Sequence, residues 1–111
     1  MIVAKPAIDI SPEQWKIVQG ILQAHIPQHT VWAFGSRATG RAKPYSDLDL
    51  AIIGSAPLGM ATHATLADAF SESDLPWKVD LVEWAKTSEA FRRIISRDKV
   101  VLQQTMHQSG N

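Results

Sequence analysis

The chain has 111 residues, 45% hydrophobic and 20% charged, which is the balance of one globular domain rather than a disordered or membrane-spanning chain. Its formal net charge is zero, which argues against bulk nucleic-acid binding by the chain itself but not against a single nucleotide. It contains no cysteine, so disulfides, thiolate chemistry and cysteine-bound zinc are excluded, and a reducing cytoplasm is the expected location.

The N-terminal part predicts a loose segment followed by a helix. Residues 1–10 mix apolar and polar types, so we expect light packing there. Ser11 is followed by Pro and, three residues after the Ser, by Gln14, which is the pattern of an N-cap with a capping box. The helix is expected to end at Pro27. Its apolar stripe at helical spacing consists of Trp15, Val18 and Leu22.

Two short strands are expected next, separated by a polar and basic connection. Residues 31–34 form an apolar run closed by Gly35, which predicts a buried strand. Residues 36–46 predict turns and one short helix. Residues 47–53 alternate acidic and apolar types before becoming wholly apolar, so we expect a strand whose first half emerges from the core.

The second half predicts two helices around a third strand. After a loop over residues 54–59, a helix is expected over 61–72, a strand over 79–84 and a helix over 88–97. The residues expected to face inward from these helices are Leu66, Ala67, Phe70, Phe91, Ile94 and Ile95.

The order of these elements gives the fold class. Residues 100–102 are expected to continue the packing, and the tail after Gln103 is expected to be unstructured. Helices that alternate with three short strands predict an α/β (or α+β) layer, in which one sheet packs against helices. We expect a single domain over residues 1–111.

Two aspartates at the start of the second strand are the first candidates for chemistry. Asp47 and Asp49 are two residues apart, so on a strand their carboxylates would lie on one face, about 7 Å apart along the chain. Close carboxylates raise one another's pKa unless a cation lies between them, and Mg²⁺ prefers such oxygen ligands. The alternative is two solvated acids where a loop meets a strand.

A third acid, Asp80, stands among the apolar residues of the third strand. A buried acid is unfavourable unless it is paired or bound to a metal. The alternative is that Asp80 lies on the solvent face of an edge strand. If its strand lies beside that of Asp47 and Asp49, three carboxylates converge, and such a set can hold two Mg²⁺ ions about 3.5–4 Å apart.

A glycine–serine pair follows the first strand. Gly35 would let the backbone approach a ligand closely, and Ser36 offers a hydroxyl and an amide to phosphate oxygens. The alternative is an ordinary strand-to-helix turn with Ser36 as N-cap. Of the nearby cations, Arg37 is the best candidate for neutralising a triphosphate, whereas Arg41 and Lys43 are read as a solvated basic loop.

Together these residues resemble a known signature. Gly35-Ser36, a gap of ten residues and Asp47-Leu48-Asp49 resemble the motif of the polymerase-β-like nucleotidyltransferase superfamily. Within it, the string over residues 35–50 looks like that of the minimal nucleotidyltransferases, a small prokaryotic group, and Asp80 matches the family's third acid. The resemblance covers roughly residues 30–84. Two further positions that fit the group's pattern are Gly40 and Ser46.

The resemblance implies a nucleotidyltransferase fold, a small mixed sheet packed against helices. It implies that Gly35 and Ser36 contact the triphosphate of ATP or another nucleoside triphosphate. It further implies that Asp47 and Asp49 bind Mg²⁺, two ions in all, and that Asp80 completes the site and helps to activate the acceptor hydroxyl. The further nucleotide-binding candidates are Arg37 and Ser46.

Minimal members of the superfamily are similar to antitoxins that pair with a small helical partner of the HEPN class. The toxic member of that class is a ribonuclease. Some silence that partner by transferring AMP to one of its tyrosines. Larger members carry an extra domain that recognises the acceptor, for which 111 residues leave no room. The resemblance therefore implies an Mg²⁺-dependent protein adenylyltransferase, and a homo- or hetero-oligomer stays open.

Two other functions stay open. The chain could neutralise its partner by covering it, with Trp77 and Trp84 as exposed interface residues, although both tryptophans could equally be core. It could also modify a small-molecule acceptor. Loss of the three aspartates would distinguish occlusion, which should survive it, from catalysis, which should not. The four histidines show no metal-ligand spacing: they are His25, His29, His63 and His107.

Overall fold

The computed structural model describes residues 5–104. Along the chain the elements are α1 (Pro12–His25), β1 (Thr30–Phe34), α2 (Ser36–Thr39), β2 (Leu48–Ile53), α3 (Met60–Ser71), β3 (Val79–Glu83), the 3₁₀ turn η1 (Trp84–Lys86), α4 (Glu89–Asp98) and β4 (Val100–Gln103).

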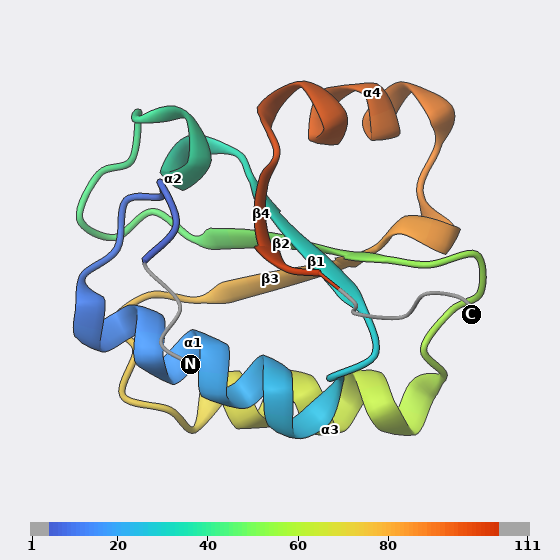
Figure 1. The fold of residues 1–111 in the computed structure, drawn as a ribbon, viewed down its shortest axis with the longest axis horizontal. Coiled ribbons are helices and arrows are strands. Elements are labelled where there is room, and N and C mark those ends of the chain that lie inside the picture. Colours follow the sequence, from blue (N-terminus) through green and yellow to red (C-terminus); the bar gives the residue numbers. More distant parts are fainter. Residues whose placement is uncertain (1–4, 105–111) are drawn as a thin grey trace.

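The sheet is mixed and has the strand order β3-β2-β1-β4 (Figure 1). β1 runs antiparallel to both β2 and β4, whereas β2 and β3 are parallel. A parallel pair needs a crossover connection, and α3 supplies it between β2 and β3. The predicted mixed sheet packed against helices is therefore confirmed.

Helices cover the two faces of the sheet unequally. α1 and α3 lie together against one face, and α4 lies against the other, on the same side as the short α2 (Figure 1). The larger core fills the α1–α3 side and includes Leu22, Leu50 and Leu66. The smaller core lies under α4 and is built on Phe34, Ala51 and Ile95.

The predicted start of α1 is confirmed in detail. The backbone N–H of Gln14 donates to Ser11 Oγ at 3.1 Å, and the N–H of Ser11 donates to Gln14 Oε1 at 2.8 Å. This capping box satisfies two amides that would otherwise lack partners. The expected stripe of α1 is also buried: Trp15, Val18 and Leu22.

Two expectations about packing are wrong. The described part of the segment before α1, residues 5–11, is not loosely packed, because Ile8 and Ile10 are buried in the main core. Ile94, expected to face inward from α4, is 43% exposed, because the face of α4 that packs on the sheet presents Phe91 and Ile95 instead. Of the two interpretations left open for Trp77, core packing is the correct one, because Trp77 is only 8% exposed and belongs to the core.

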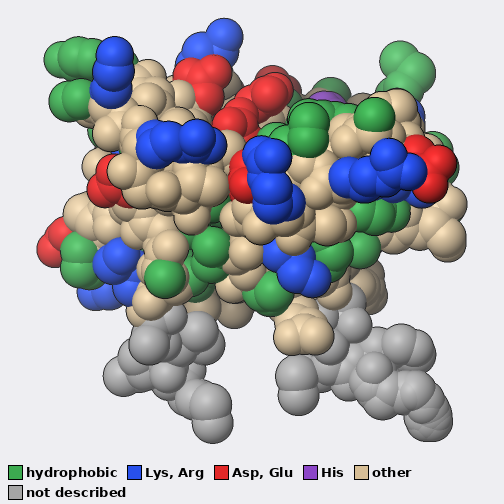
Figure 2. All heavy atoms as spheres, turned by 90° about the horizontal axis from the view of Figure 1, so that it is seen from above, with side chains coloured by type: hydrophobic (Ala, Val, Ile, Leu, Met, Phe, Trp, Pro, Cys, Tyr) green, Lys and Arg blue, Asp and Glu red, His purple; other side chains and the backbone are tan. Residues whose placement is uncertain are grey.

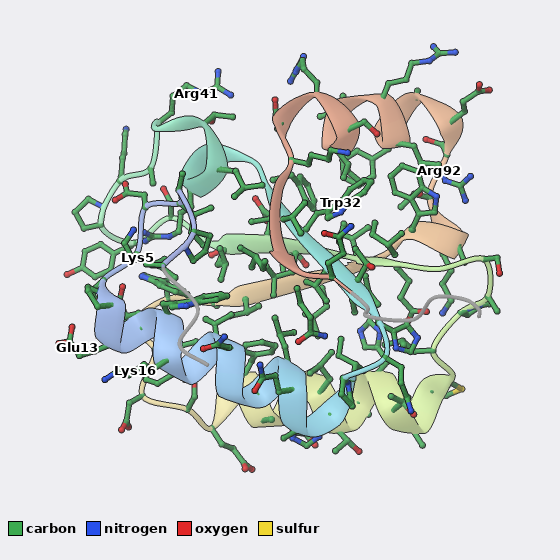
Figure 3. All side chains as sticks on the ribbon, in the orientation of Figure 1. Lys5, Glu13, Lys16, Trp32, Arg41 and Arg92 are labelled. Carbon is green, nitrogen blue, oxygen red and sulfur yellow. The ribbon has the colours of Figure 1, made fainter. Side chains whose placement is uncertain are left out.

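The other tryptophan of that hypothesis also packs within the fold. Trp84 is half-buried and lies edge-on to Trp32, with ring centroids 5.5 Å apart. The guanidinium of Arg92 lies 5.0 Å from the centre of the Trp84 ring, and Trp32 and Arg92 lie in the layer between α4 and the sheet (Figure 3). These contacts favour the packing interpretation of both tryptophans.

The C-terminal end contains a strand that the periodicity did not predict. Residues 100–102, expected only to continue the packing, belong to β4 (Val100–Gln103), which pairs with β1 and places Val101 opposite Trp32. Four residues are too few for an alternating pattern to be recognised. The expected unstructured tail over residues 105–111 lies outside the described residues. In the described part of the chain, no helix has the length and apolar character needed to cross a membrane.

Candidate active site

The sheet brings the predicted acids to one place. β2 and β3 pair in parallel so that Asp49 lies directly opposite Asp80. Asp47 lies one residue before β2, two positions from Asp49, so the pleat places all three on the face that carries α4. Asp47 and Asp80 are exposed and Asp49 is half-buried. On this face, acidic side chains gather with Lys and Arg side chains nearby (Figure 2).

Gly35 lies against the central acid. Phe34 ends β1 opposite Asp49, and the chain then turns at Gly35 with a φ of 77° before α2 begins at Ser36. A Cβ atom at position 35 would collide with Asp49 Oδ2 and lie 3.3 Å from its Cγ. Gly35 itself is the N-cap of α2, so the alternative with Ser36 as N-cap is wrong. The turn therefore places main-chain atoms directly beside a carboxylate.

The negative charges of this cluster act on its central member, Asp49. The pKa of Asp49 is raised from 3.8 to about 6, first by burial and then by the negative charges of Asp80 and Asp47. Carboxylates that repel one another in this way are relieved by a hard cation. The chemistry of the donor set therefore fits Mg²⁺.

The carboxylates do not form a closed cage. Over residues 5–104, no group of three or more His, Cys, Asp or Glu side chains lies close enough together to hold a metal ion by itself. Mg²⁺ is ordinarily bound by one or two carboxylates, while phosphates of the substrate and water complete its shell. An open set of acids beside Gly35 is the arrangement expected for a metal that arrives with a nucleotide.

The raised pKa predicts that Asp49 destabilises the metal-free protein. Because the folded state holds the Asp49 proton more tightly than the unfolded chain, stability falls as the pH rises from about 4 to about 6, and the loss persists above that range. Asp49→Asn should therefore raise the free energy of unfolding by about 1–2 kcal/mol at pH 8, after allowance for solvent screening. Urea denaturation in EDTA measures this.

The gain should be nearly gone at about pH 3.5, where Asp49 is protonated in the folded state and mostly protonated in the unfolded chain. Asp68→Asn, which removes an exposed carboxylate from α3, is the control and should change stability little. An Asp49→Asn variant less stable than the wild type at pH 8 would contradict the electrostatic account.

Arg37 has a position different from the one expected. It is 5% exposed, and its guanidinium lies 4.5 Å from the centre of the Trp77 ring. Its N–H groups donate to the backbone carbonyls of Asp9 (2.7 Å), Ser46 (2.9 Å), Pro44 (3.0 Å) and Lys43 (3.3 Å). The expectation that Arg37 neutralises a triphosphate gives way to a structural role, because these carbonyls already occupy most of its donors.

Ser46 belongs to the same arrangement. Its Oγ accepts the backbone N–H of Lys43 at 2.9 Å, which closes the turn before Asp47. Its own carbonyl is held by Arg37. These hydrogen bonds fix the turn over residues 43–46, and the turn sets the position of Asp47, one residue before β2.

Arg37→Met is expected to lower the free energy of unfolding by about 2–4 kcal/mol, because several carbonyls lose a charged donor in a half-buried place. Arg41→Met is the matched control on the same connection. Arg41 is exposed and points away from the molecule (Figure 3), so its loss should change stability by less than about 0.5 kcal/mol. Thermal denaturation of both variants tests this, and equal effects would contradict the role of Arg37.

A second polar cluster went unnoticed in the sequence. Glu83 is 5% exposed and accepts from His63 Nδ1 at 2.6 Å and from the backbone N–H of Leu58 at 2.8 Å. Burial raises the pKa of Glu83, but these hydrogen bonds and the nearby Lys86 outweigh burial and hold it below its usual value. Glu83 lies at the end of β3 remote from Asp80 and on the opposite face, so the cluster ties α3 to the sheet.

Known proteins match most of the chain. The family described as "Polymerase beta, Nucleotidyltransferase" matches residues 16–107. The chain is 58% identical, over 97 residues, to a protein of Haemophilus influenzae named "Probable protein adenylyltransferase MntA"; the match covers 87% of this chain and 85% of the relative.

Solved structures share the fold. The crystal structure of a toxin–antitoxin with AMP-PNP matches with a TM-score of 0.69 and 25% identity, over 83% of this chain and 74% of the other. A structure of a tri-AMPylated Shewanella oneidensis HEPN toxin in complex with an MNT antitoxin matches with a TM-score of 0.63 and 22% identity, over 84% and 71% of the two chains.

Proposed function

The chain belongs to the polymerase-β nucleotidyltransferase family, and on this premise we propose that it is a protein adenylyltransferase, which moves AMP from ATP to a hydroxyl group of a HEPN-type partner protein. In this proposal it acts as the antitoxin of a toxin–antitoxin pair. The relative from Haemophilus, more than half identical, bears the name of such an enzyme. ATP is abundant in the cytoplasm, which supports a cytoplasmic location.

One observation carries the proposal. Asp49 faces Asp80 across the parallel strands, and the main chain at Gly35 lies against the Asp49 carboxylate. This arrangement sets hard oxygen donors next to main-chain groups that can approach phosphate closely. Transfer of a nucleotidyl group needs little else from a protein, because the chemistry depends on positioning and on stabilising phosphoryl charge.

In this proposal each residue of the site has a separate role in binding or in catalysis. Gly35 and Ser36 hold the β- and γ-phosphates, and Asp47 and Asp49 face the α-phosphate. Two Mg²⁺ ions, bound through Asp47, Asp49 and Asp80, would neutralise the triphosphate and favour the ionised acceptor hydroxyl. Asp80, exposed at the edge of the cluster, takes the proton from that hydroxyl.

The transfer is a single displacement. The acceptor oxygen forms a bond to the α-phosphorus, and the bond from that phosphorus to the α,β-bridging oxygen breaks. Pyrophosphate leaves with the electron pair, and AMP stays on the acceptor. Because attack is in line, the acceptor oxygen and the leaving oxygen lie on opposite sides of the phosphorus.

Intact-mass spectrometry tests the proposal. The purified chain is mixed with ATP, Mg²⁺ and the HEPN-type protein of the same genome, and both proteins are then weighed. We expect AMP additions on the partner, and none with the Asp47→Ala, Asp49→Ala double variant. A partner that stays unmodified yet is bound and inactive would overturn the transfer reaction in favour of neutralisation by occlusion.

A further inference from the structure

A pocket of about 470 Å³ opens beside Asp47. Its walls come from the turn before β2, the C-terminal half of α3 and the segment that leads into β3. The lining residues that matter below are Tyr45, Asp47, Ala67, Phe70, Trp77 and Lys78. A volume of this size suits one large side chain or a small molecule.

The floor of the pocket is buried and its rim is open. Phe70 and Trp77 are 5% and 8% exposed, and Trp77 is held by the guanidinium of Arg37. Tyr45, by contrast, is 83% exposed, although the turn that carries it is fixed by hydrogen bonds to Arg37. An aromatic ring left in solvent on a fixed turn is typical of a contact site for another molecule.

The strand order places this pocket on one particular side of the acids. Gly35 follows β1, Asp49 lies in β2, and Lys78 precedes β3, which forms the edge of the sheet. Of the three acids, only Asp47 lines the pocket, at the β3 side of the cluster and away from Gly35. The pocket floor lies in the layer of α3, on the sheet face opposite Asp49, so the pocket adjoins the acids around the β3 edge of the sheet. Because pyrophosphate leaves on the Gly35 side in the proposed reaction, in-line attack requires the acceptor to arrive from the side of β3.

We propose that this pocket receives an apolar or aromatic side chain of the partner's acceptor segment, next to the residue that carries the attacking hydroxyl. The inference rests on the proposed function, whose direction of attack it uses. Trp77 and Phe70 provide the apolar floor, and Tyr45 closes over the inserted side chain. The exposed Lys78 gives the rim a polar group for the backbone of the segment.

Steady-state kinetics with two pairs of variants test the pocket. Tyr45→Ala removes the rim, and Met60→Ala is its control, an 88% exposed apolar residue at the start of α3 and outside the pocket. Ala67→Phe fills the pocket from α3, and Ala64→Phe, on an exposed position of the same helix, is its control. Tyr45→Ala and Ala67→Phe should each raise the KM for the HEPN-type protein about tenfold and leave the KM for ATP within about twofold.

The controls should change neither constant. A raised KM for ATP with an unchanged KM for the protein would assign the pocket to the nucleoside and overturn the inference. Unchanged constants for both substrates in the Tyr45 and Ala67 variants would also overturn it.

Calorimetric titration separates this inference from the proposed function. If the wild type transfers no AMP, the proposed function fails, but the affinity for the HEPN-type protein can still be measured. A Tyr45→Ala variant that then binds about tenfold more weakly than Met60→Ala supports the pocket as a partner site. Equal affinities of the two variants would refute it.

Discussion

Asp49→Asn is expected to reduce AMP transfer by about 10³-fold or more while the protein becomes more stable. The amide keeps the size of the side chain but removes the central negative charge of the cluster, which lies between Asp80 and the main chain at Gly35. Loss of one group that stabilises charge in a transition state ordinarily reduces the rate by factors of this order. The rate is measured at saturating ATP and Mg²⁺ as AMP incorporated into the partner.

Activity and stability are expected to change in opposite directions, and this separates a catalytic role from a structural one. A variant that loses activity by unfolding is less stable, whereas Asp49→Asn relieves the repulsion that raises the pKa of Asp49 to about 6. Asp80→Asn should abolish transfer as well, and Asp68→Asn should retain it. Transfer at the wild-type rate by Asp49→Asn or Asp80→Asn would refute the assignment of the site.

Gly35→Ala is expected to impair both folding and transfer. Position 35 has a φ of 77°, where an L-residue is strained, and the new Cβ would collide with the Asp49 carboxylate. The backbone or the acid must then move. We expect a loss of about 2–4 kcal/mol of stability and at least about a 10²-fold loss of transfer activity, because small displacements of a reacting group have large effects on rate.

Gly40→Ala is the matched control for this change. Gly40 ends α2 with the same φ of 77°, but a Cβ there would meet no atom within 4 Å. It should therefore lower stability by about 1 kcal/mol and keep most of the activity. Denaturation and transfer rates of the two variants isolate the close approach of Gly35 to Asp49, and equal losses of activity would argue against it.

Several elements of the fold could be predicted because their signals are local. The start of α1 depends on Ser11 and Gln14, three residues apart, and the N-cap of α4 is Ser88, at the start of the helix expected over 88–97. In both cases the hydrogen bonds close within one helical turn. The limits of β3 were less accurate, since Trp84 was expected in the strand but begins η1. Strand ends depend on partners that lie elsewhere in the chain.

The candidate site was partly predictable, because most of its residues lie close together in one segment of the sequence. Gly35-Ser36 and the pair Asp47 and Asp49 stand within fifteen residues, and Asp80 is recognisable as an acid in an apolar strand. The actual partners of Arg37 were not predictable. Backbone carbonyls carry no signature in the sequence, and that of Asp9 lies 28 residues away. For the same reason, Glu83 and His63 could not be paired in advance.

By itself, the sequence determined which residues can form helices, which short runs can be strands, and which acids are available to a metal and a nucleotide. These properties follow from periodicity, capping and side-chain chemistry, all of which act over a few residues. Only the tertiary structure decided that β2 and β3 are parallel and in register, which sets Asp49 opposite Asp80. It also decided that Arg37 is buried under the turn and that β4 joins the sheet. Those outcomes depend on contacts between distant segments, which form only when the whole core is assembled.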